Sequence, residues 1–474
     1  MLRIWFVVVC GAVVASACSG DSRSDSPQVR EAGHTESTAA SFVVIVTDDQ
    51  RADEIEASYM PELNARLIDR GTLFTQYRNN VALCCPGRAT ILTGRYAHNH
   101  KVLTNTNTGA LDHPDRTIAR WLDDAGYRTA YIGKYLNGYG CDGRRPRGWD
   151  DWRALCGERV QRPYGYSIRD GDAVETHGEA ESDFQTDVLA ELAVETIEDA
   201  AAAGEPFFVV VAPTPPHSLL HPAPRHEDLL PGYETPIRPN TNEPDVGDKP
   251  RHIRELPSDA AEDVRVNGVG RLRELAAVDD LVATIDDALA RVSRRDEAYV
   301  VYTSDNGFLN REHRIQKGKN WLYEESLRVP FVVRGPGIPA GVTNDGFVAN
   351  IDLAPTLAAI AGVRPGAPVD GVDFRPVLSD PRAFDDRVLL HMRRGQPDAD
   401  GVTTGSRWRY VRWSTGEEEL YDLDADPYEL ESLHDEVAYA EVKRQLAALV
   451  DELKTCAGTS CHLTHTTADG AAHG

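Results

Sequence analysis

Five short runs of apolar and β-branched residues recur along the chain, with turn-forming residues near their ends. They are too short for helices and predict buried strands. The runs are Phe42 to Val46, Arg128 to Ile132, Phe207 to Val211, Tyr299 to Tyr302 and Pro330 to Val333. Between them, residues 183–203 and 270–292 carry apolar residues at three- and four-residue steps, which predicts helices. This alternation predicts an α/β fold, with a mostly parallel central sheet flanked by helices.

Polar residues follow four of these predicted strands. They are Thr47-Asp48-Asp49, Gly133-Lys134, a proline-rich segment that contains His217, and Ser304-Asp305-Asn306-Gly307. Parallel sheets bind ligands beyond the carboxyl ends of their strands. We therefore expect one site at this edge, assembled from distant segments.

The pattern changes near residue 383. Residues 408–413 and 420–423 predict short strands, and residues 439–454 predict a helix. We expect a main domain over residues 41–382 and a small C-terminal α+β subdomain over residues 383–474. Residues 213–257 are rich in proline and predict a long ordered loop.

The N-terminus is typical of an export signal. Residues 1–17 combine Arg3, an apolar run and the small residues 15–17, which predicts a signal peptide. Cys18 also fits a bacterial lipobox, so lipidation and plain secretion both stay open. Residues 18–40 are polar and predict a flexible tether. The protein is expected to be secreted or lipid-anchored on the outer face of the cell membrane, and to meet a membrane only through a lipid on Cys18.

Six cysteines follow the tether. In an oxidising compartment, short separations predict two local disulfides, Cys141 with Cys156 and Cys456 with Cys461. Cys84 and Cys85 remain, either as thiols or as a vicinal disulfide. Zinc is not expected, because no Cys or His cluster has ligand spacing.

The charge balance is strongly acidic. The formal net charge is −25, which argues against a nucleic-acid partner. An anionic substrate would need a local positive site. The chain has 50 lysines and arginines, of which only seven are lysines.

Asp48, Asp49, Asp305 and Asn306 form two acidic pairs at strand ends. They offer hard oxygen ligands, which suit Ca²⁺ or Mg²⁺ rather than zinc. Helix capping or solvation would explain one such pair. Two pairs favour a metal site.

Residues 84–88 read Cys-Cys-Pro-Gly-Arg. Pro86 predicts that Cys84 lies at a helix N-terminus, where backbone N–H groups favour an anion. Arg88, about one turn later, can reach back toward the metal carboxylates. The alternative is a buried cysteine pair that only fills the core.

The Cys84-x-Pro86-x-Arg88 spacing resembles the signature of type I sulfatases, in the alkaline phosphatase superfamily. The similarity extends from about Phe42 to the C-terminus and is greatest to N-acetylglucosamine-6-sulfatases. It rests on Leu83 to Pro86, Leu92-Thr93-Gly94, His98-Asn99-His100, Gly133 to Asn137, Tyr302 to Gly307, Tyr323-Glu324, Arg334 to Gly337, Asp352 to Thr356, Leu420 to Leu423, Asp426-Pro427 and Glu429.

This resemblance implies an alkaline phosphatase-like fold and a sulfuric ester hydrolase. Cys84 would be oxidised to formylglycine by a formylglycine-generating enzyme, and its hydrate would attack sulfur. Formylglycine 84 would join Asp48, Asp49, Asp305 and Asn306 around calcium, with magnesium as the alternative. The implied substrate is a sulfated carbohydrate, such as 6-sulfated N-acetylglucosamine, or an aryl sulfate.

The resemblance also implies roles for basic residues. Lys134 and Lys319 match positions that grip the sulfate, and His217 matches a histidine that binds sulfate or protonates the leaving oxygen. Many sulfatases have a further histidine soon after the first lysine, where this chain has Leu136 and Asn137. We expect Asn137 at the substrate.

Two further substrate contacts are expected. His313 resembles a second family histidine near the site. Trp149, within Trp149-Asp150-Asp151-Trp152, predicts either a sugar-facing wall or ordinary packing.

Two other functions stay open. One is a phosphodiesterase or phosphonate monoester hydrolase of the same superfamily. The other is a surface lipoprotein that keeps the fold without catalysis.

Overall fold

The computed structural model describes residues 39–106, 111, 116–217, 221–258, 262–316, 318–405 and 407–465. The predicted signal peptide at residues 1–17, Cys18 and nearly all of the predicted tether lie outside these residues. Within them, no helix is both long and apolar enough to cross a membrane.

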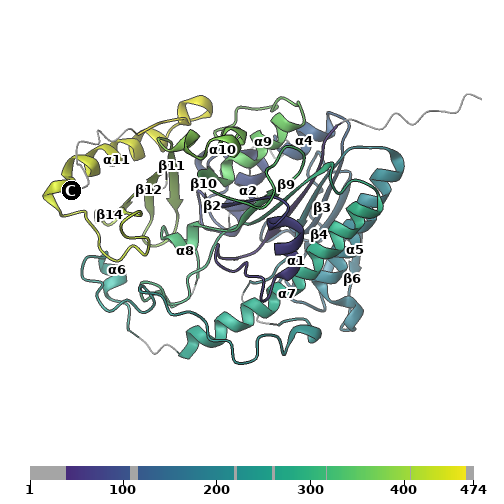
Figure 1. The fold of residues 1–474 in the computed structure, drawn as a ribbon, viewed down its shortest axis with the longest axis horizontal. Helices are drawn as coiled ribbons and strands as arrows, with labels where there is room; N and C mark the ends of the chain where they lie inside the picture. The colour runs from purple at the N-terminus through teal and green to yellow at the C-terminus, as the bar shows by residue number, and fades with distance from the viewer. Residues whose placement is uncertain are drawn as a thin grey trace, which may run out of the picture. The chain divides into compact units, whose positions relative to one another are not determined.

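A ten-stranded sheet forms the centre of the fold (Figure 1). Its order is β10-β2-β9-β8-β1-β7-β3-β4-β5-β6. The strands are β1 Ser41–Thr47, β2 Thr72–Arg78, β3 Arg128–Lys134, β4 Asp151–Cys156, β5 Ser167–Asp170, β6 Ala173–Thr176, β7 Phe207–Ala212, β8 Ala298–Ser304, β9 Phe331–Arg334 and β10 Val342–Ala349. The block β8-β1-β7-β3-β4 is parallel throughout. β9 is antiparallel to both neighbours, and β5 and β6 extend the sheet in antiparallel fashion.

Helices cover both faces of this sheet. The α-helices of the described residues, of which α11 packs on the second sheet instead, are α1 Pro61–Leu63, α2 Cys84–Thr93, α3 Ala97–His100, α4 Ile118–Asp123, α5 Gln185–Ala203, α6 Arg251–Arg254, α7 Glu262–Arg291, α8 Glu324–Leu327, α9 Leu353–Ile360, α10 Arg375–Ser379 and α11 Ala440–Leu453. Figure 1 shows α5 and α7 along one face and α2, α4 and α9 along the other.

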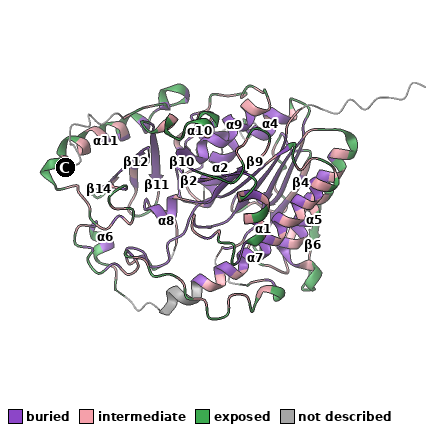
Figure 2. Cartoon of the chain, in the orientation of Figure 1, coloured by how far each residue is buried: buried purple, intermediate pink, exposed green. Residues whose placement is uncertain are grey.

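Each face of the sheet has its own core, because side chains alternate along a strand. In β1, Phe42, Val44 and Val46 pack with α2, α4 and α9. Val43 and Ile45 pack with α5 and α7. The strands are therefore buried on both sides, as their colour in Figure 2 shows. Burial on both sides explains why they read as unbroken apolar runs.

A second, antiparallel sheet follows near the C-terminus. Its strands are β11 Val388–Arg393, β12 Ala399–Thr404, β13 Trp408–Trp413 and β14 Glu418–Asp422, in that order. Helix α11 packs on it through Leu446, Val450 and Leu453. A mostly parallel sheet with flanking helices and a small α+β part confirms the predicted fold class.

Both predicted disulfides are present, Cys141–Cys156 and Cys456–Cys461. Cys84 and Cys85 are free and buried, so the vicinal disulfide is wrong.

Candidate active site

Four neighbouring parallel strands bring distant polar residues to one edge of the large sheet. In the order β8-β1-β7-β3, the segments after them carry Asp305, Asp48 and His217, and β3 ends at Lys134. Carboxyl ends of parallel strands share one edge, so these residues meet although the chain separates them widely. We call the assembly the strand-end cluster. Its members are Asp48, Asp49, Cys84, Arg88, Lys134, His217, Asp305, Asn306 and Lys319.

The acidic residues of the cluster are held by hydrogen bonds to one another. The backbone N–H of Asp49 donates to Asp305 Oδ1 at 3.2 Å, and Asn306 Nδ2 donates to Asp49 Oδ1 at 2.7 Å. Asp49 has a φ of 71°, an uncommon conformation for a residue with a side chain. All are buried, which fixes their oxygens in place.

Cys84 lies at the first residue of α2, as Pro86 predicts. Its Sγ is 3.4 Å from Asp48 Oδ1. Helix α2 can approach the strand ends closely because residue 87 is glycine: a Cβ there would lie 2.2 Å from the carbonyl oxygen of Asp305. Burial, with the nearby Asp48 carboxylate, raises the pKa of the Cys84 thiol. An unmodified Cys84 is therefore a poor thiolate nucleophile.

Three cations face the carboxylates. Lys134 Nζ contacts Asp48 Oδ2, and Lys319 Nζ contacts Asp49 Oδ1 while lying 2.8 Å from Cys84 Sγ. Arg88 Nε donates to Asp305 Oδ2 at 2.7 Å, and its NH1 donates to the Lys134 carbonyl at 2.6 Å. Arg88 thus joins α2 to two strand ends.

The same groups set the protonation of the acids. Burial alone raises the pKa of Asp48, but the surrounding cations, Lys134 foremost, hold the pKa of this carboxyl well below its usual range. Burial and the Asp48 charge raise the pKa of Asp305 to about 6. Crowded carboxylates of this kind favour a bound cation.

His217 lies at the same edge, in the loop after β7. Its Nε2 is 3.7 Å from Asp49 Oδ2 and 3.1 Å from Gln161 Nε2. Burial lowers the pKa of His217, although Asp48 and Asp49 oppose the shift. No motif or strand end in the sequence predicted Gln161 as a residue of the site.

The oxygen atoms of the cluster fit a hard divalent cation. Asn306 Oδ1 is buried and accepts no hydrogen bond within the described residues, which leaves an acceptor for a metal. Ligand atoms of Asp48, Asp49, Cys84 and His217 lie within 4.8 Å of one another. Carboxylate and amide oxygens suit Ca²⁺ or Mg²⁺.

Arg271 in α7 supports the site from behind and was not predicted. It makes a two-pronged contact with Glu54, with Nε to Oε1 at 2.8 Å and NH2 to Oε2 at 2.7 Å. It also donates to the backbone carbonyls of Asp49 at 2.6 Å and Pro216 at 3.1 Å. Arg271 therefore ties the loop of the metal carboxylates to the loop of His217.

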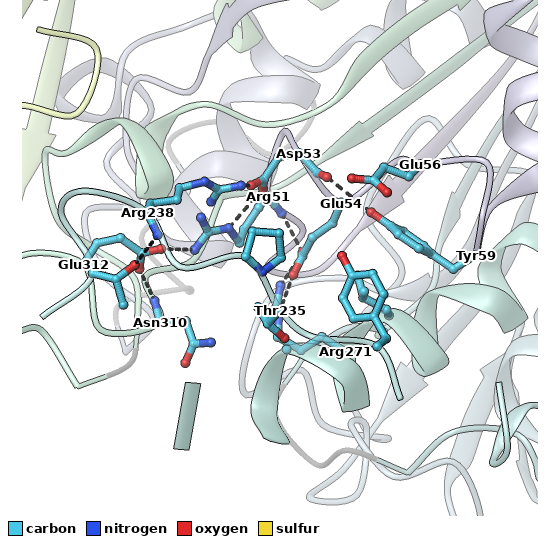
Figure 3. A pocket seen from close by; sticks show the side chains of 15 residues that line it. Arg51, Asp53, Glu54, Glu56, Tyr59, Thr235, Arg238, Arg271, Asn310 and Glu312 are labelled. Carbon is cyan, nitrogen blue, oxygen red and sulfur yellow. Dashed lines mark hydrogen bonds and ion pairs between the residues drawn. The ribbon is translucent and has the colours of Figure 1, made fainter. Parts of the chain in front are cut away.

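Arg271 belongs to a charged network around a small cavity of about 60 Å³ (Figure 3). Arg51 continues this network: its backbone N–H donates to Glu54 at 3.0 Å and its guanidinium to Glu312 at 2.7 Å. Arg51 also donates to the carbonyl of Phe308, just after Asn306. The network therefore braces the segments after β1 and β8.

Asn137 lies beside the cluster. Its backbone N–H is 3.0 Å from Cys85 Sγ, and its Oδ1 is buried without a hydrogen-bond partner among the described residues.

Trp149 does not form a sugar-facing wall. It is 4% exposed and packs against Tyr131, Trp152 and Phe208 in the core. Packing, the alternative interpretation of this segment, is the correct one.

His313 lies in a different environment from the strand-end cluster. It is fully buried, its Nδ1 is 2.6 Å from Glu243 Oε2, and it stacks on Tyr323. A hydrogen bond to Glu243 raises the pKa of His313 despite the opposing effect of burial. Burial does not decide the expected contact with substrate, because Cys84 and Lys134 are buried as well, so this contact stays a prediction.

Comparison with known proteins places the chain in a family. Residues 40–363 match the family described as Sulfatase, and residues 312–456 match "N-sulphoglucosamine sulphohydrolase, C-terminal". The N-acetylglucosamine-6-sulfatase of Capra hircus is 34% identical over 359 residues, 71% of this chain and 63% of the relative. A Sulf-1 homolog of Caenorhabditis elegans is 34% identical over 375 residues, 76% of this chain, but the chain spans only 51% of that relative.

Solved structures share the fold. The complex of BT4656 with its substrate D-glucosamine-2-N,6-O-disulfate superposes with a TM-score of 0.75 at 23% identity, covering 88% of this chain and 97% of the other. Because the family match alone covers more than half of the residues, this chain belongs to the sulfatase family.

Proposed function

We propose that this protein hydrolyses sulfate esters, using a formylglycine made from Cys84 and a bound calcium ion, with magnesium as the alternative. The position of Cys84 carries the proposal. It lies at the start of α2, between the Asp48 carboxylate and the Lys319 ammonium group. A nucleophile there faces both metal-binding oxygens and a cation suited to sulfate.

The chain supplies the surroundings for two groups that it must acquire. Asp48, Asp49, Asp305 and Asn306 would hold the metal, whose charge favours binding of the sulfate oxygens. Hydrated formylglycine at position 84 would supply one hydroxyl that attacks sulfur and a second whose deprotonation releases sulfate.

Basic side chains complete the site. Lys319 and Lys134 bind the sulfate oxygens and stabilise the charge that develops during transfer. Arg88 holds Asp305 and keeps α2 against the strand ends. His217 Nε2 faces the same space and donates a proton to the departing alcohol oxygen.

We further propose a 6-sulfated amino sugar as substrate, free or in a glycan. Relatives named as N-acetylglucosamine-6-sulfatases, at 34% identity in goat and human, support this class. Secretion or lipid anchoring through Cys18 and maturation by a formylglycine-generating enzyme remain part of the same proposal.

Mass spectrometry of the peptide spanning residue 84, from protein made in its native host, tests the nucleophile. We expect an aldehyde in place of the thiol, and an intact cysteine in fully active protein would contradict the proposal. Assays on 6-sulfated N-acetylglucosamine, an aryl sulfate and a phosphodiester test the reaction. Much faster turnover of the diester would make the protein a phosphodiesterase.

Chelation tests the metal. EDTA should abolish sulfate hydrolysis, and added Ca²⁺ should restore it and raise the melting temperature, because a ligand that binds only the folded state stabilises it. Full activity after exhaustive chelation would exclude the metal.

A further inference from the structure

The side chain of Gln185 joins two turns that lie far apart in the sequence. Gln185 is the first residue of α5 and is 1% exposed. Its Nε2 donates to the backbone carbonyls of Val160 at 3.0 Å and Arg162 at 2.9 Å, on either side of Gln161. Its Oε1 accepts a hydrogen bond from Thr214 Oγ1 at 2.7 Å. One buried amide therefore holds the turn of Gln161 against the segment that follows β7.

His217 lies in that same segment. Its backbone N–H donates to the carbonyl of Thr214 at 3.0 Å, which closes a turn. The side chain of Gln161 reaches this turn, and its Nε2 is 3.1 Å from His217 Nε2. This ring nitrogen is also the one that lies 3.7 Å from Asp49 Oδ2. Gln161 therefore contacts the atom of His217 that faces the proposed metal site.

The backbone before His217 is held from a second side. The backbone N–H of Asp48 donates to the Pro215 carbonyl at 3.2 Å, and Arg271 NH1 donates to the Pro216 carbonyl at 3.1 Å. These contacts fix the main chain at this position but not the two rotatable bonds of the histidine side chain. Side-chain contacts must therefore set the direction of the ring, and Gln161 supplies one of them at Nε2.

A glutamine is well suited to this contact. Its amide carries both N–H donors and a carbonyl acceptor, so it can pair with a ring nitrogen whether or not that nitrogen carries a proton. A histidine that donates a proton passes through both states. Proton transfer also needs the donor within hydrogen-bond reach of the receiving oxygen, and a displacement of about 1 Å can cost about 100-fold in rate.

We propose that Gln161, held in place by Gln185, is a positioning residue for sulfate ester hydrolysis. It fixes the His217 ring so that Nε2 faces the alcohol oxygen of the ester. When the S–O bond breaks, its electron pair goes to this oxygen, which takes the proton from Nε2 and leaves as the alcohol. This inference rests on the proposed function and adds two glutamines to its mechanism.

Two sulfate esters with different leaving groups test the inference. Gln161→Met keeps the length of the side chain and removes its hydrogen-bonding groups. The kcat/KM for 6-sulfated N-acetylglucosamine, whose alcohol needs a proton to leave, should fall about 10- to 100-fold. The kcat/KM for para-nitrophenyl sulfate, whose phenolate leaves without a proton, should fall less than about 3-fold. Equal losses on the two esters would overturn the inference.

A double-mutant cycle shows whether Gln161 acts through His217. In a His217→Ala background, Gln161→Met should lower kcat/KM for the sugar ester less than about 2-fold, because the group that it positions is already absent. Losses that multiply would mean that Gln161 contacts the substrate itself, which would refute the positioning role. Gln445→Met is the matched control and should leave both esters unaffected, since Gln445 Oε1 is 3.0 Å from Nε2 of another histidine, His465, in the C-terminal part of the chain.

Crystal structures separate a failure of this inference from a failure of the proposed function. In Gln161→Met, the distance between His217 Nε2 and Asp49 Oδ2, 3.7 Å here, should increase by more than about 1 Å. Gln185→Leu should displace the ring in the same way, because it releases the turn of Gln161. A ring that stays in place in both variants would overturn the inference even where sulfate hydrolysis is confirmed. If the wild type hydrolyses no sulfate ester, the proposed function fails, and the ring position alone decides whether Gln161 positions His217.

Discussion

Two buried charged clusters in the described residues contain similar side chains in different arrangements. The strand-end cluster is assembled at the carboxyl ends of parallel strands. The second, which we call the inter-sheet cluster, consists of Arg78, His313, Glu324, Arg409 and Glu429. In it, Glu324 binds Arg78 of the large sheet through two hydrogen bonds of 2.8 Å and also binds Arg409 of the small sheet.

The difference lies in the lysines, because the strand-end cluster has Lys134 and Lys319 beside Arg88, whereas arginines alone bind Glu324 in the inter-sheet cluster. Lysines contact Asp48 and Asp49 through single ammonium groups, which can turn toward a substrate. Arginines in the inter-sheet cluster are fixed in forked contacts, and Arg409 also donates to Thr403 and to the carbonyl of Leu322. Buried charge alone therefore does not identify a catalytic site. We expect changes in the first cluster to affect activity and changes in the second to affect stability.

Cys84→Ala should show the largest difference between the effect on activity and the effect on stability. Removal of the nucleophile should lower kcat at least about 10⁴-fold. The free energy of unfolding should change by no more than about 2 kcal/mol. Cys85→Ala is the control, because Cys85 is also buried but its Sγ accepts a hydrogen bond from the Asn137 backbone rather than facing the carboxylates. Comparable activity of the two variants in a sulfate-release assay would break the comparison.

Arg409→Met should instead lower stability and leave activity nearly unchanged. It leaves Glu324 buried with one partner fewer, which should lower the free energy of unfolding by about 3–5 kcal/mol. Activity per folded molecule should change little. Arg412→Met is the control, since Arg412 pairs with Asp451 at the exposed surface and should contribute about 0–1 kcal/mol. Urea unfolding measures both, and loss of activity without loss of stability would contradict the assignment.

The contrast between strands of apolar residues and strands that include polar ones explains what could be predicted of the fold. β1, β3, β7 and β8 are apolar on both faces, so their runs are visible in the sequence. β2 reads Thr-Leu-Phe-Thr-Gln-Tyr-Arg, and β12 contains Asp, Gly and Thr, so neither forms an apolar run. Pairing across the sheet, rather than local pattern, makes these segments strands.

The same limit applies to the site. Asp48 and Asp305 could be predicted because they end visible strands. Arg271 could not, because it acts on the backbone carbonyl of Asp49, 222 residues away, and resembles any arginine of an amphipathic helix. Trp149 was placed by residue type, which does not distinguish core packing from contact with a substrate.

Arg271→Lys tests whether the contacts of Arg271 with Glu54 and with the carbonyls of Asp49 and Pro216 are needed for activity or only for stability. Lysine keeps the charge but cannot hold Glu54 and two carbonyls together. The loops of Asp49 and His217 should shift, which should lower kcat about 10- to 100-fold. Arg273→Lys is the control, because Arg273 Nε donates to the Leu229 carbonyl. A lower melting temperature with unchanged kcat would assign Arg271 a structural role only.

The smallest effect concerns the pH dependence of the inter-sheet cluster. Burial, together with Glu324 and Glu325 and against Arg409, raises the pKa of Glu429 to about 8, from 4.5 for an ordinary glutamate. A group with a raised pKa in the folded state stabilises the fold below its unfolded pKa, and this contribution is lost as pH rises to the folded pKa. His313, whose pKa is also raised, acts in the same direction.

The free energy of unfolding should therefore fall between about pH 5 and about pH 8, by at most about 1.4 kcal/mol per pH unit for one proton. Glu429→Gln should remove this part of the slope, while the exposed Glu431→Gln should leave it in place. Urea unfolding across that range measures the slope directly. An unchanged slope in Glu429→Gln would mean that Glu429 is ionised, with Arg409 as its counter-ion, and that the two clusters differ less in their charge than the comparison supposes.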